Sequence, residues 1–167
     1  PFAGKDYPKV KQVQEKAFYN AGAHSCTTIL SHDNIDSEEN LQLAREAHLI
    51  YFAGGSQGKL AKHMRGTKLL QLVKERYREG AVIAGTSAGA SVMSRVMVAG
   101  RSKQGGEDLT KVIRENTVYT AEGFGLVENI IIHQHFLYRH RHNRLYSVLL
   151  DYMDLRGVGI DESTAIV

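Results

Sequence analysis

The 167-residue sequence has little cysteine, little net charge and no long apolar run. Its single cysteine, Cys26, excludes an internal disulfide framework and is compatible with a reducing compartment, so the cytoplasm is favoured. Because no run of about 18 or more apolar residues occurs, we expect no membrane-spanning segment and no membrane partner. The net charge of +3 is too mild to favour nucleic acid as the main partner.

Repeats, low-complexity segments and polar linkers are also missing, which predicts a single domain over residues 1–167. The chain begins with Pro1 rather than methionine, and Ala165 to Val167 are typical of a strand interrupted in mid-course. We therefore expect a fragment of a longer chain, without the first strand and the C-terminal strands of its sheet. For the same reason the missing leader says little about the compartment.

Apolar segments alternate with amphipathic ones along the chain. We predict strands at 26–30, 48–53, 81–84, 130–132, 157–160 and 164–167, and a glycine-rich loop at 100–108. Helices are expected at 8–21, from a cap at Asp36 or Ser37 to 47, from 57 to 64, from a cap at Thr67 to Gly80, and at 139–152. Strands and helices at this spacing predict an α/β fold, a three-layer open parallel sheet with helices on both faces.

The stretch from Ala81 to Ala90 carries the clearest motif. Its apolar residues indicate a short buried strand, and Gly-Thr-Ser-Ala-Gly then turns the chain into a helix of small residues. This is the G-x-S-x-G nucleophile elbow, a strained turn that exposes Ser87 at the carboxyl edge of a sheet. Side chains in place of Gly85 and Gly89 would collide with the tight turn. A helix that begins at Ala88 directs its N–H groups at a developing oxyanion.

Two other strand ends carry chemistry, because functional residues of an open parallel sheet collect beyond the carboxyl ends of its strands. Gly54 to Gln57 follow one strand, and their N–H groups are candidates for a second oxyanion donor. His133 and His135 follow another and are candidates for the base that takes the serine proton. Spacing alone leaves the base open between them, and leaves the orienting acid open among Glu107, Asp108, Asp161 and Glu162.

Three arginines, Arg139, Arg141 and Arg144, follow this last strand within a few residues. Arginine presents a planar fork that binds a carboxylate through two parallel hydrogen bonds. Beside a serine site the cluster indicates an acidic substrate, although a solvated basic face explains the same spacing as well.

Together these motifs resemble the cyanophycinase family. The shared segments are Phe-Ala-Gly-Gly-Ser-Gln at 52–57, Ala-Gly-Thr-Ser-Ala-Gly-Ala at 84–90, Gln-His-Phe at 134–136 with the three arginines and Leu145, and Gly-Ile-Asp-Glu at 159–162. They occur in the same order and at similar spacing over essentially the whole chain. Cyanophycinases are serine-type exopeptidases related to aspartyl dipeptidases. They release β-aspartyl-arginine dipeptides from cyanophycin, and their flavodoxin-like sheet is similar to that of class I glutamine amidotransferases.

The resemblance implies a role for each matching residue. Ser87 is the expected nucleophile, His135 the base and Glu107 the acid, with the N–H groups of Gly55 and Ala88 as oxyanion donors. The expected substrate contacts are Gln57, Gln134, Arg139, Arg141 and Arg144. An aspartyl peptide or cyanophycin-like polymer is the expected substrate, and the family also implies a homodimer without cofactor or metal.

His133 departs from the family, which has aspartate before Gln-His-Phe. The substitution replaces a negative group with a neutral or positive one. We therefore expect weak activity on cyanophycin and better activity on aspartyl peptides that lack arginine.

Two other functions fit parts of the sequence. His133 and His135 with His140 and His142 have the spacing of zinc ligands, but a metal hydrolase leaves the elbow unexplained. A relative without catalytic activity would use the same arginine-rich segment to bind nucleic acid or an acidic polymer.

Overall fold

The computed structural model describes residues 7–29, 34–102 and 111–167. The chain divides into two compact units, Pro1–Gly89 and Ala90–Val167. The mixed α/β class is confirmed, whereas the single domain over residues 1–167 stays a prediction. Among the described residues no helix has the length and apolar character needed to span a membrane.

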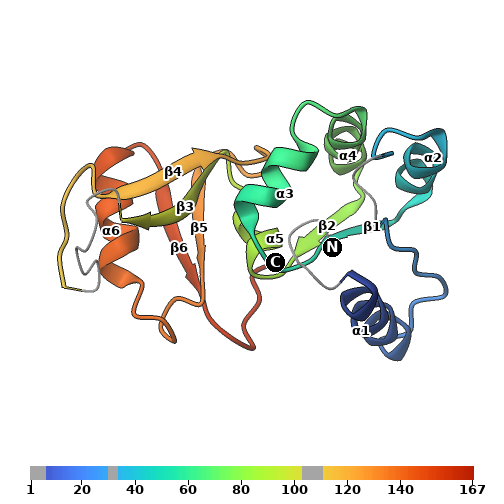
Figure 1. Cartoon of the computed structure of the whole chain (residues 1–167), viewed down its shortest axis with the longest axis horizontal. Coiled ribbons are helices and arrows are strands. Elements are labelled where there is room, and N and C mark those ends of the chain that lie inside the picture. The colour runs from blue at the N-terminus through green and yellow to red at the C-terminus, as the bar shows by residue number, and fades with distance from the viewer. Residues whose placement is uncertain (1–6, 30–33, 103–110) are drawn as a thin grey trace. The chain divides into compact units, whose positions relative to one another are not determined.

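The first unit is built on two parallel strands. β1 (Leu49–Phe52) pairs with β2 (Val82–Gly85), in a register that matches Leu49 to Val82 and Phe52 to Gly85. Helix α1 (Tyr7–Asn20) lies on one side of this pair, and α2 (Glu38–Glu46) and α4 (Lys68–Arg78) lie on the other (Figure 1). The short α3 (Gln57–Met64) follows β1. These elements were all predicted from the sequence.

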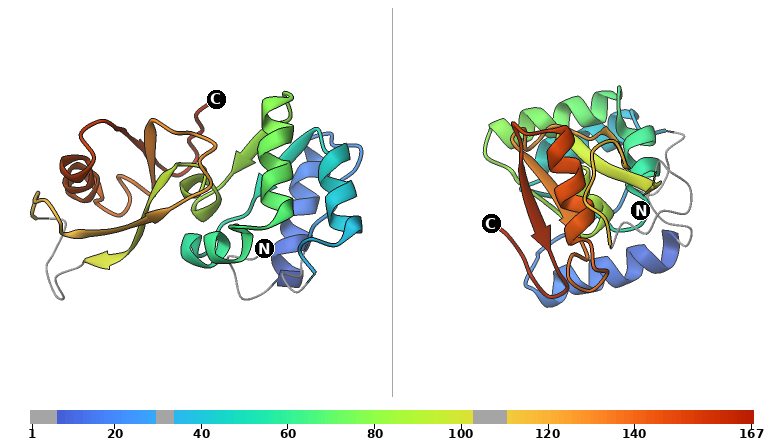
Figure 2. Two further views of the ribbon diagram at one scale, coloured as in Figure 1. Left: turned by 90° about the horizontal axis from the view of Figure 1, so that it is seen from above. Right: turned by 90° about the vertical axis from the view of Figure 1, so that its left-hand side faces the viewer.

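The caps of α2 and α4 tie these two helices together. Ser37 caps α2 and accepts from the N–H of Asn40, while Thr67 caps α4. The Asp36 carboxylate accepts from the N–H groups of Lys68 at 3.1 Å and Leu69 at 2.9 Å, so it stabilises the positive end of α4 rather than that of α2. The two helices consequently lie side by side, as Figures 1 and 2 show.

The strand predicted at Cys26–Leu30 is wrong over the residues described. Residues 25–29 have no strand partner, and Leu30 lies outside the described residues. The Tyr19 hydroxyl instead bonds both main-chain groups of Cys26, accepting from its N–H at 3.2 Å and donating to its carbonyl at 3.3 Å. A β-branched sequence forms a strand only where a neighbouring strand offers a ladder, and here a side chain satisfies the backbone.

The second unit contains one antiparallel and one parallel strand pair. After α5 (Ala88–Ser91), which begins at the end of the first unit, β3 (Val96–Ser102) pairs antiparallel with β4 (Val118–Glu122). β5 (Ile130–Gln134) pairs parallel with β6 (Arg156–Ile160). Helix α6 (His142–Asp151) packs against β6 and β4 (Figure 1). The core between them consists of Val96, Val98, Val118, Ile131, Leu145, Val148 and Leu155.

Three predictions for the second unit need correction. The hairpin of β3 and β4 was not predicted, and β3 extends through Gly100, which was expected in a loop. Gly100 has φ +62, and a Cβ there would lie 3.5 Å from the Tyr119 ring, so this glycine fits a bent strand. No strand forms at 164–167, where the side chains are exposed. Helix α6 begins at His142 instead of Arg139, because tight turns with hydrogen bonds such as Arg141 N–H to the Phe136 carbonyl precede it.

Candidate active site

The turn between β2 and α5 has the strand–turn–helix form of a nucleophile elbow. Ser87 has φ +51, a left-handed conformation that is strained for a residue with a side chain. The Thr86 N–H donates to the Phe52 carbonyl at 3.1 Å, and the Gly89 N–H donates to the Thr86 carbonyl at 2.8 Å. These bonds fix the turn to the end of β1 and hold Ser87 at its apex.

Gly89 is required by the close approach of the elbow to β1. A Cβ at this position would lie 1.9 Å from the Phe52 carbonyl oxygen, a distance no structure tolerates. Gly54, just beyond β1, faces the same turn, since a Cβ there would lie 3.4 Å from the Ser87 Cβ. The loop after β1 and the elbow therefore meet at one edge of the β1–β2 pair.

This edge also holds the other residues that the sequence placed at the serine. Gly55 has φ +138, a conformation that L-residues rarely adopt. Ser56 caps α3, which begins at Gln57, by accepting from the Lys59 N–H. Ala88, the first residue of α5, is fully buried. The first unit thus brings Ser87, Ala88, Gly55 and Gln57 to neighbouring turns.

In the second unit His135 follows β5 directly and contacts an acid. Its Nδ1 lies 2.5 Å from Oε1 of Glu162, and its side chain is 25% exposed. An ionised carboxylate only accepts hydrogen bonds, so Nδ1 carries the proton in this contact. That tautomer leaves Nε2 as a proton acceptor, the state that a general base requires.

Asp161 has a different role from its neighbour Glu162. Its carboxylate accepts from the N–H groups of Leu137 at 3.1 Å and Tyr138 at 3.3 Å, and so fixes the turn after His135. Of the acids left open by the sequence, Glu162 contacts His135 and Asp161 holds the backbone, whereas Glu107 and Asp108 lie outside the described residues.

The sequence contains a signal for the position of Glu162. The Gly-Ile-Asp-Glu segment ends β6, and β6 pairs in parallel with the strand that carries His135. Residues beyond the carboxyl ends of paired parallel strands share one edge of the sheet. A prediction of that pairing would have placed Glu162 beside His135.

Oxygen atoms of the backbone and of an amide hold two of the three arginines. Arg141 donates through Nη1 to the main-chain carbonyl of Gln134 at 2.7 Å and to its side-chain oxygen at 3.1 Å. Arg144 donates through Nη2 to the carbonyls of Ala99 and Gly100. Burial and then Arg141 lower the pKa of Arg144 to about 10, so it remains charged near neutral pH. A carbonyl oxygen carries no net charge, so these hydrogen bonds do not neutralise the guanidinium of Arg144.

The surroundings of these arginines add positive potential. Arg141 occupies the N-cap position of α6 without a capping hydrogen bond from its side chain, at the helix end where the dipole disfavours a cation. Arg139 is exposed in the turn before α6, and burial first and then the charge of Arg139 lower the pKa of Arg141, against an opposite effect of Glu162. This end of α6 is therefore suited to an anionic group such as a carboxylate.

His133 lies in the core and not at the site edge. It is 1% exposed, and in the described part of the chain no hydrogen bond within normal limits reaches either ring nitrogen. Burial first, then Arg144 and Arg141, lower the pKa of His133 to about 3, against a smaller opposite effect of Gln134. His133 is thus neutral near pH 7, and the geometry favours His135 as the base. Among the described residues, no three histidines, cysteines or acids lie close enough together to hold a metal ion.

The sequence profile of peptidase family S51 matches residues 1–167 of this chain. A cyanophycinase of Thermosynechococcus vestitus is 31% identical over 167 residues, which cover 98% of this chain and 50% of the relative. A cyanophycinase of Geminocystis herdmanii is 33% identical over 153 residues, covering 90% of this chain and 54% of the relative. The chain thus spans about half the length of the curated relatives it matches.

Solved structures agree with this assignment. A peptidase from an acI-B1 actinobacterium is 28% identical, with a TM-score of 0.67 over 93% of this chain and 60% of that one. A putative peptidase E of Listeria monocytogenes is 18% identical, with a TM-score of 0.62 over 95% of this chain and 74% of that one, and it supports the fold alone. The chain belongs to peptidase family S51.

Proposed function

We propose that this protein is a serine peptidase similar to cyanophycinase, an exopeptidase that cleaves aspartyl peptides with Ser87, His135 and Glu162. The observation that carries the proposal is the contact between His135 Nδ1 and Glu162. This contact places the imidazole proton on Nδ1, so Nε2 can accept a proton. The strained, glycine-flanked Ser87 supplies the matching nucleophile. Membership of the S51 family supports the same reaction.

The proposed reaction follows the usual two steps of serine peptidases. His135 Nε2 takes the Ser87 proton while the serine oxygen attacks the scissile carbonyl, and Glu162 stabilises the imidazolium that forms. The N–H groups of Gly55 and Ala88 donate to the oxyanion of the tetrahedral intermediate. His135 then returns the proton to the leaving amine. Water attacks the acyl-enzyme with His135 again as base, which releases the acid product and free Ser87.

An acidic substrate fits the second unit. Arg141 and Arg144 donate to carbonyl and amide oxygens, which carry no net charge, and the negative charge of Glu162 acts on Arg141. A substrate carboxylate would supply the missing counter-charge, and Arg139 and Gln134 lie within the same short segment. Gln57, at the start of α3, is proposed to contact the substrate from the serine side. Aspartyl peptides therefore fit better than neutral ones.

The fold proposed for this chemistry is a three-layer, flavodoxin-like sheet that forms a single domain. Two parallel strand pairs, and helices on both sides of β1 and β2, support it. Such a sheet would place the ends of β2 and β5 at one edge, where Ser87 and His135 are needed. A homodimer, a cytoplasmic location and the absence of nucleic-acid and membrane partners stay predictions.

The test is amine release from cyanophycin and from a panel of α- and β-aspartyl dipeptides, with wild-type protein and Ser87→Ala. We expect turnover by the wild type and only a residual rate in the variant, because the triad acts as a unit. Near-native turnover by Ser87→Ala would refute the serine mechanism. Loss of wild-type activity on chelation would favour a metal hydrolase, and saturable binding of an acidic polymer without amine release would favour a non-catalytic relative.

A further inference from the structure

Thr86, the residue before Ser87, is held to β1 through its side chain as well as its main chain. The hydroxyls of Tyr51 and Thr86 share a hydrogen bond. Tyr51 lies opposite Ala84 in the parallel pair. The ladder continues past the end of β2, because the Thr86 N–H donates to the Phe52 carbonyl at 3.1 Å. Residues two positions apart on a strand project from the same face, so Thr86 follows Ala84 on the face that carries Tyr51.

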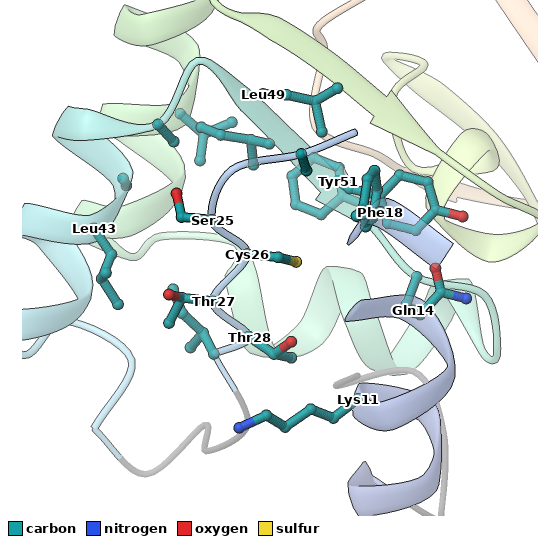
Figure 3. Close-up of a pocket in the computed structure, with 18 of the residues that line it drawn as sticks. Lys11, Gln14, Phe18, Ser25, Cys26, Thr27, Thr28, Leu43, Leu49 and Tyr51 are labelled. Atoms are coloured by element: carbon teal, nitrogen blue, oxygen red, sulfur yellow. The ribbon is translucent and has the colours of Figure 1, made fainter. Parts of the chain in front are cut away.

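Helix α1 orients the Tyr51 ring. Phe18 meets Tyr51 edge to face, with ring centroids 5.1 Å apart and ring planes at 79°. Both rings line a cavity of about 440 Å³ within the first unit (Figure 3). Burial raises the pKa of the Tyr51 hydroxyl, and the hydrogen bond to Thr86 acts in the opposite direction. Tyr51 therefore keeps its proton near neutral pH and serves as a neutral hydrogen-bonding group.

Three contacts together fix Thr86. Its N–H donates to the Phe52 carbonyl, its own carbonyl accepts from the Gly89 N–H at 2.8 Å, and its side chain bonds Tyr51. The next residue, Ser87, has φ +51. A residue with a side chain keeps such a strained conformation only where the surrounding structure fixes the chain beside it. Of the three contacts, the one with Tyr51 depends on a side chain that the elbow motif itself does not contain.

We propose that Tyr51 is a positioning residue for the peptidase reaction, whose hydroxyl holds the Thr86 side chain and so keeps Ser87 at the apex of the elbow. The role of Tyr51 rests on the proposed function, in which Ser87 is the nucleophile. Tyr51 acts on the elbow and not on the substrate, so loss of its hydroxyl lowers kcat and leaves KM unchanged. Because Tyr51 does not titrate near neutral pH, the pH profile of kcat keeps its shape.

The first test measures the elbow without any turnover, by backbone hydrogen exchange in the wild type and in Tyr51→Phe, which keeps the ring and removes the hydroxyl. We expect the N–H groups of Thr86 and Gly89 to exchange at least about fivefold faster in the variant. The internal control is the Val82 N–H, which donates to the His48 carbonyl at 2.9 Å at the start of β2 and should be unaffected. Unchanged exchange at Thr86 and Gly89, or equal acceleration at Val82, would overturn the proposal.

The second test uses steady-state kinetics on a β-aspartyl dipeptide. Thr86→Val removes the other hydroxyl, whereas Thr86→Ser keeps one. We expect kcat to fall about fivefold or more in Tyr51→Phe and in Thr86→Val, and no further in the double variant, because all three lose the same bond. Thr86→Ser should stay near the wild-type kcat. The matched control is Tyr77→Phe, the same change at an exposed tyrosine of α4, and it should leave kcat unchanged.

The two tests separate the role of Tyr51 from the proposed function. A rise in KM without a fall in kcat, a changed pH profile, or losses that multiply in the double variant would refute positioning through Thr86. If the wild type releases no amine from any peptide of the panel, the proposed function fails. Exchange at Thr86 and Gly89 then still decides whether the Tyr51 hydroxyl holds the elbow.

Discussion

Glu162 contacts His135 because the two residues follow neighbouring strands that end in register. Gln134, the last residue of β5, pairs with Ile160, the last residue of β6, so His135 and Glu162 leave the sheet at the same edge. Their side chains meet with Nδ1 and Oε1 2.5 Å apart. Helix α6 connects the two strands, so one βαβ unit contains both the proposed base and its proposed acid. Within this βαβ unit, the pairing of β5 with β6 sets the distance between His135 and Glu162.

The first prediction compares Glu162→Gln with Asp161→Asn. Glutamine keeps the shape of Glu162 but cannot stabilise the imidazolium, so we expect kcat to fall about 10²-fold or more with little change in KM. Asp161→Asn weakens the turn that carries His135, and we expect a lower melting temperature and a smaller loss of kcat. Steady-state kinetics on a β-aspartyl dipeptide give both values. A larger loss of kcat in Glu107→Gln than in Glu162→Gln would make Glu107 the acid, as the family resemblance implies.

The second prediction concerns two glycines in similar sequence settings. Gly89→Ala places a Cβ 1.9 Å from the Phe52 carbonyl oxygen, so we expect it to lower the free energy of unfolding by about 3 kcal/mol or more. The matched control is Gly58→Ala in α3, where nothing lies within 4 Å of the added Cβ. Alanine has a higher helix propensity than glycine, so Gly58→Ala should raise the free energy of unfolding by about 0.5–1 kcal/mol. Urea unfolding followed by circular dichroism checks both, and equal effects would contradict the packing at the elbow.

The elements that could be predicted from the sequence are those marked by a signal within their own residues. The elbow, the caps at Ser37 and Thr67, and the strands that end at Phe52 and Gln134 follow from glycine spacing, capping residues and apolar runs. The strand expected at 26–30 failed for a non-local reason, because strand formation needs a neighbour that sequence periodicity does not reveal. The β3–β4 hairpin was missed because Gly100 resembles a loop residue, although it sits in a bent strand.

In the candidate site, too, some residues follow from a local sequence signal and others do not. Ser87 belongs to a motif contained in five residues, so sequence reasoning identifies it. His135 is the expected base from the resemblance, and the burial of His133 gives a physical reason to propose His135 over it. The proposed acid, Glu162, lies 27 positions from His135 and meets it through the register of β5 and β6, which no periodicity in the sequence predicts. For the same reason the uncompensated charge of Arg144 required the structure.

The third prediction tests whether Arg141 and Arg144 bind the substrate carboxylate or have only a structural role. Arg141→Met and Arg144→Met remove a charge-assisted contact to a substrate carboxylate, so KM for a β-aspartyl dipeptide should rise about 10- to 100-fold. A neutral dipeptide should be affected little. Arg95→Ala is the control, because this arginine is half exposed and pairs only loosely with Asp154 at 3.8 Å. Equal effects on acidic and neutral peptides would point to a structural role for the arginines.

The fourth prediction is a pH dependence of stability that arises from His133. The pKa of His133 is about 3 in the folded protein, below its ordinary value of 6.5, because the charged form is disfavoured in the core. Between these values the unfolded chain binds one more proton, so His133 lowers stability as pH falls from 6.5 to 3, by at most about 1.4 kcal/mol per pH unit.

The matched variant for this pH effect is His133→Leu, which fills a similar volume without titrating. We expect its free energy of unfolding to depend less on pH than that of the wild type between pH 6.5 and 4, and equally above pH 7. Urea titrations at several pH values measure the difference. Parallel curves for the two proteins across this range would show that His133 is protonated in the folded state.

The last prediction concerns the substrate. A neutral His133 adds no negative charge beside Arg141 and Arg144, which favours a bare carboxylate and disfavours a substrate guanidinium. We therefore expect weak activity on cyanophycin and better activity on aspartyl peptides without arginine. His133→Asp would introduce a carboxylate that these arginines keep ionised, and it should raise the ratio of kcat/KM for β-aspartyl-arginine to that for β-aspartyl-leucine about tenfold. His133→Asn has a similar shape without the charge and should leave the ratio near the wild-type value. An unchanged ratio in His133→Asp, or an equal rise in His133→Asn, would show that the charge at this position does not select the substrate.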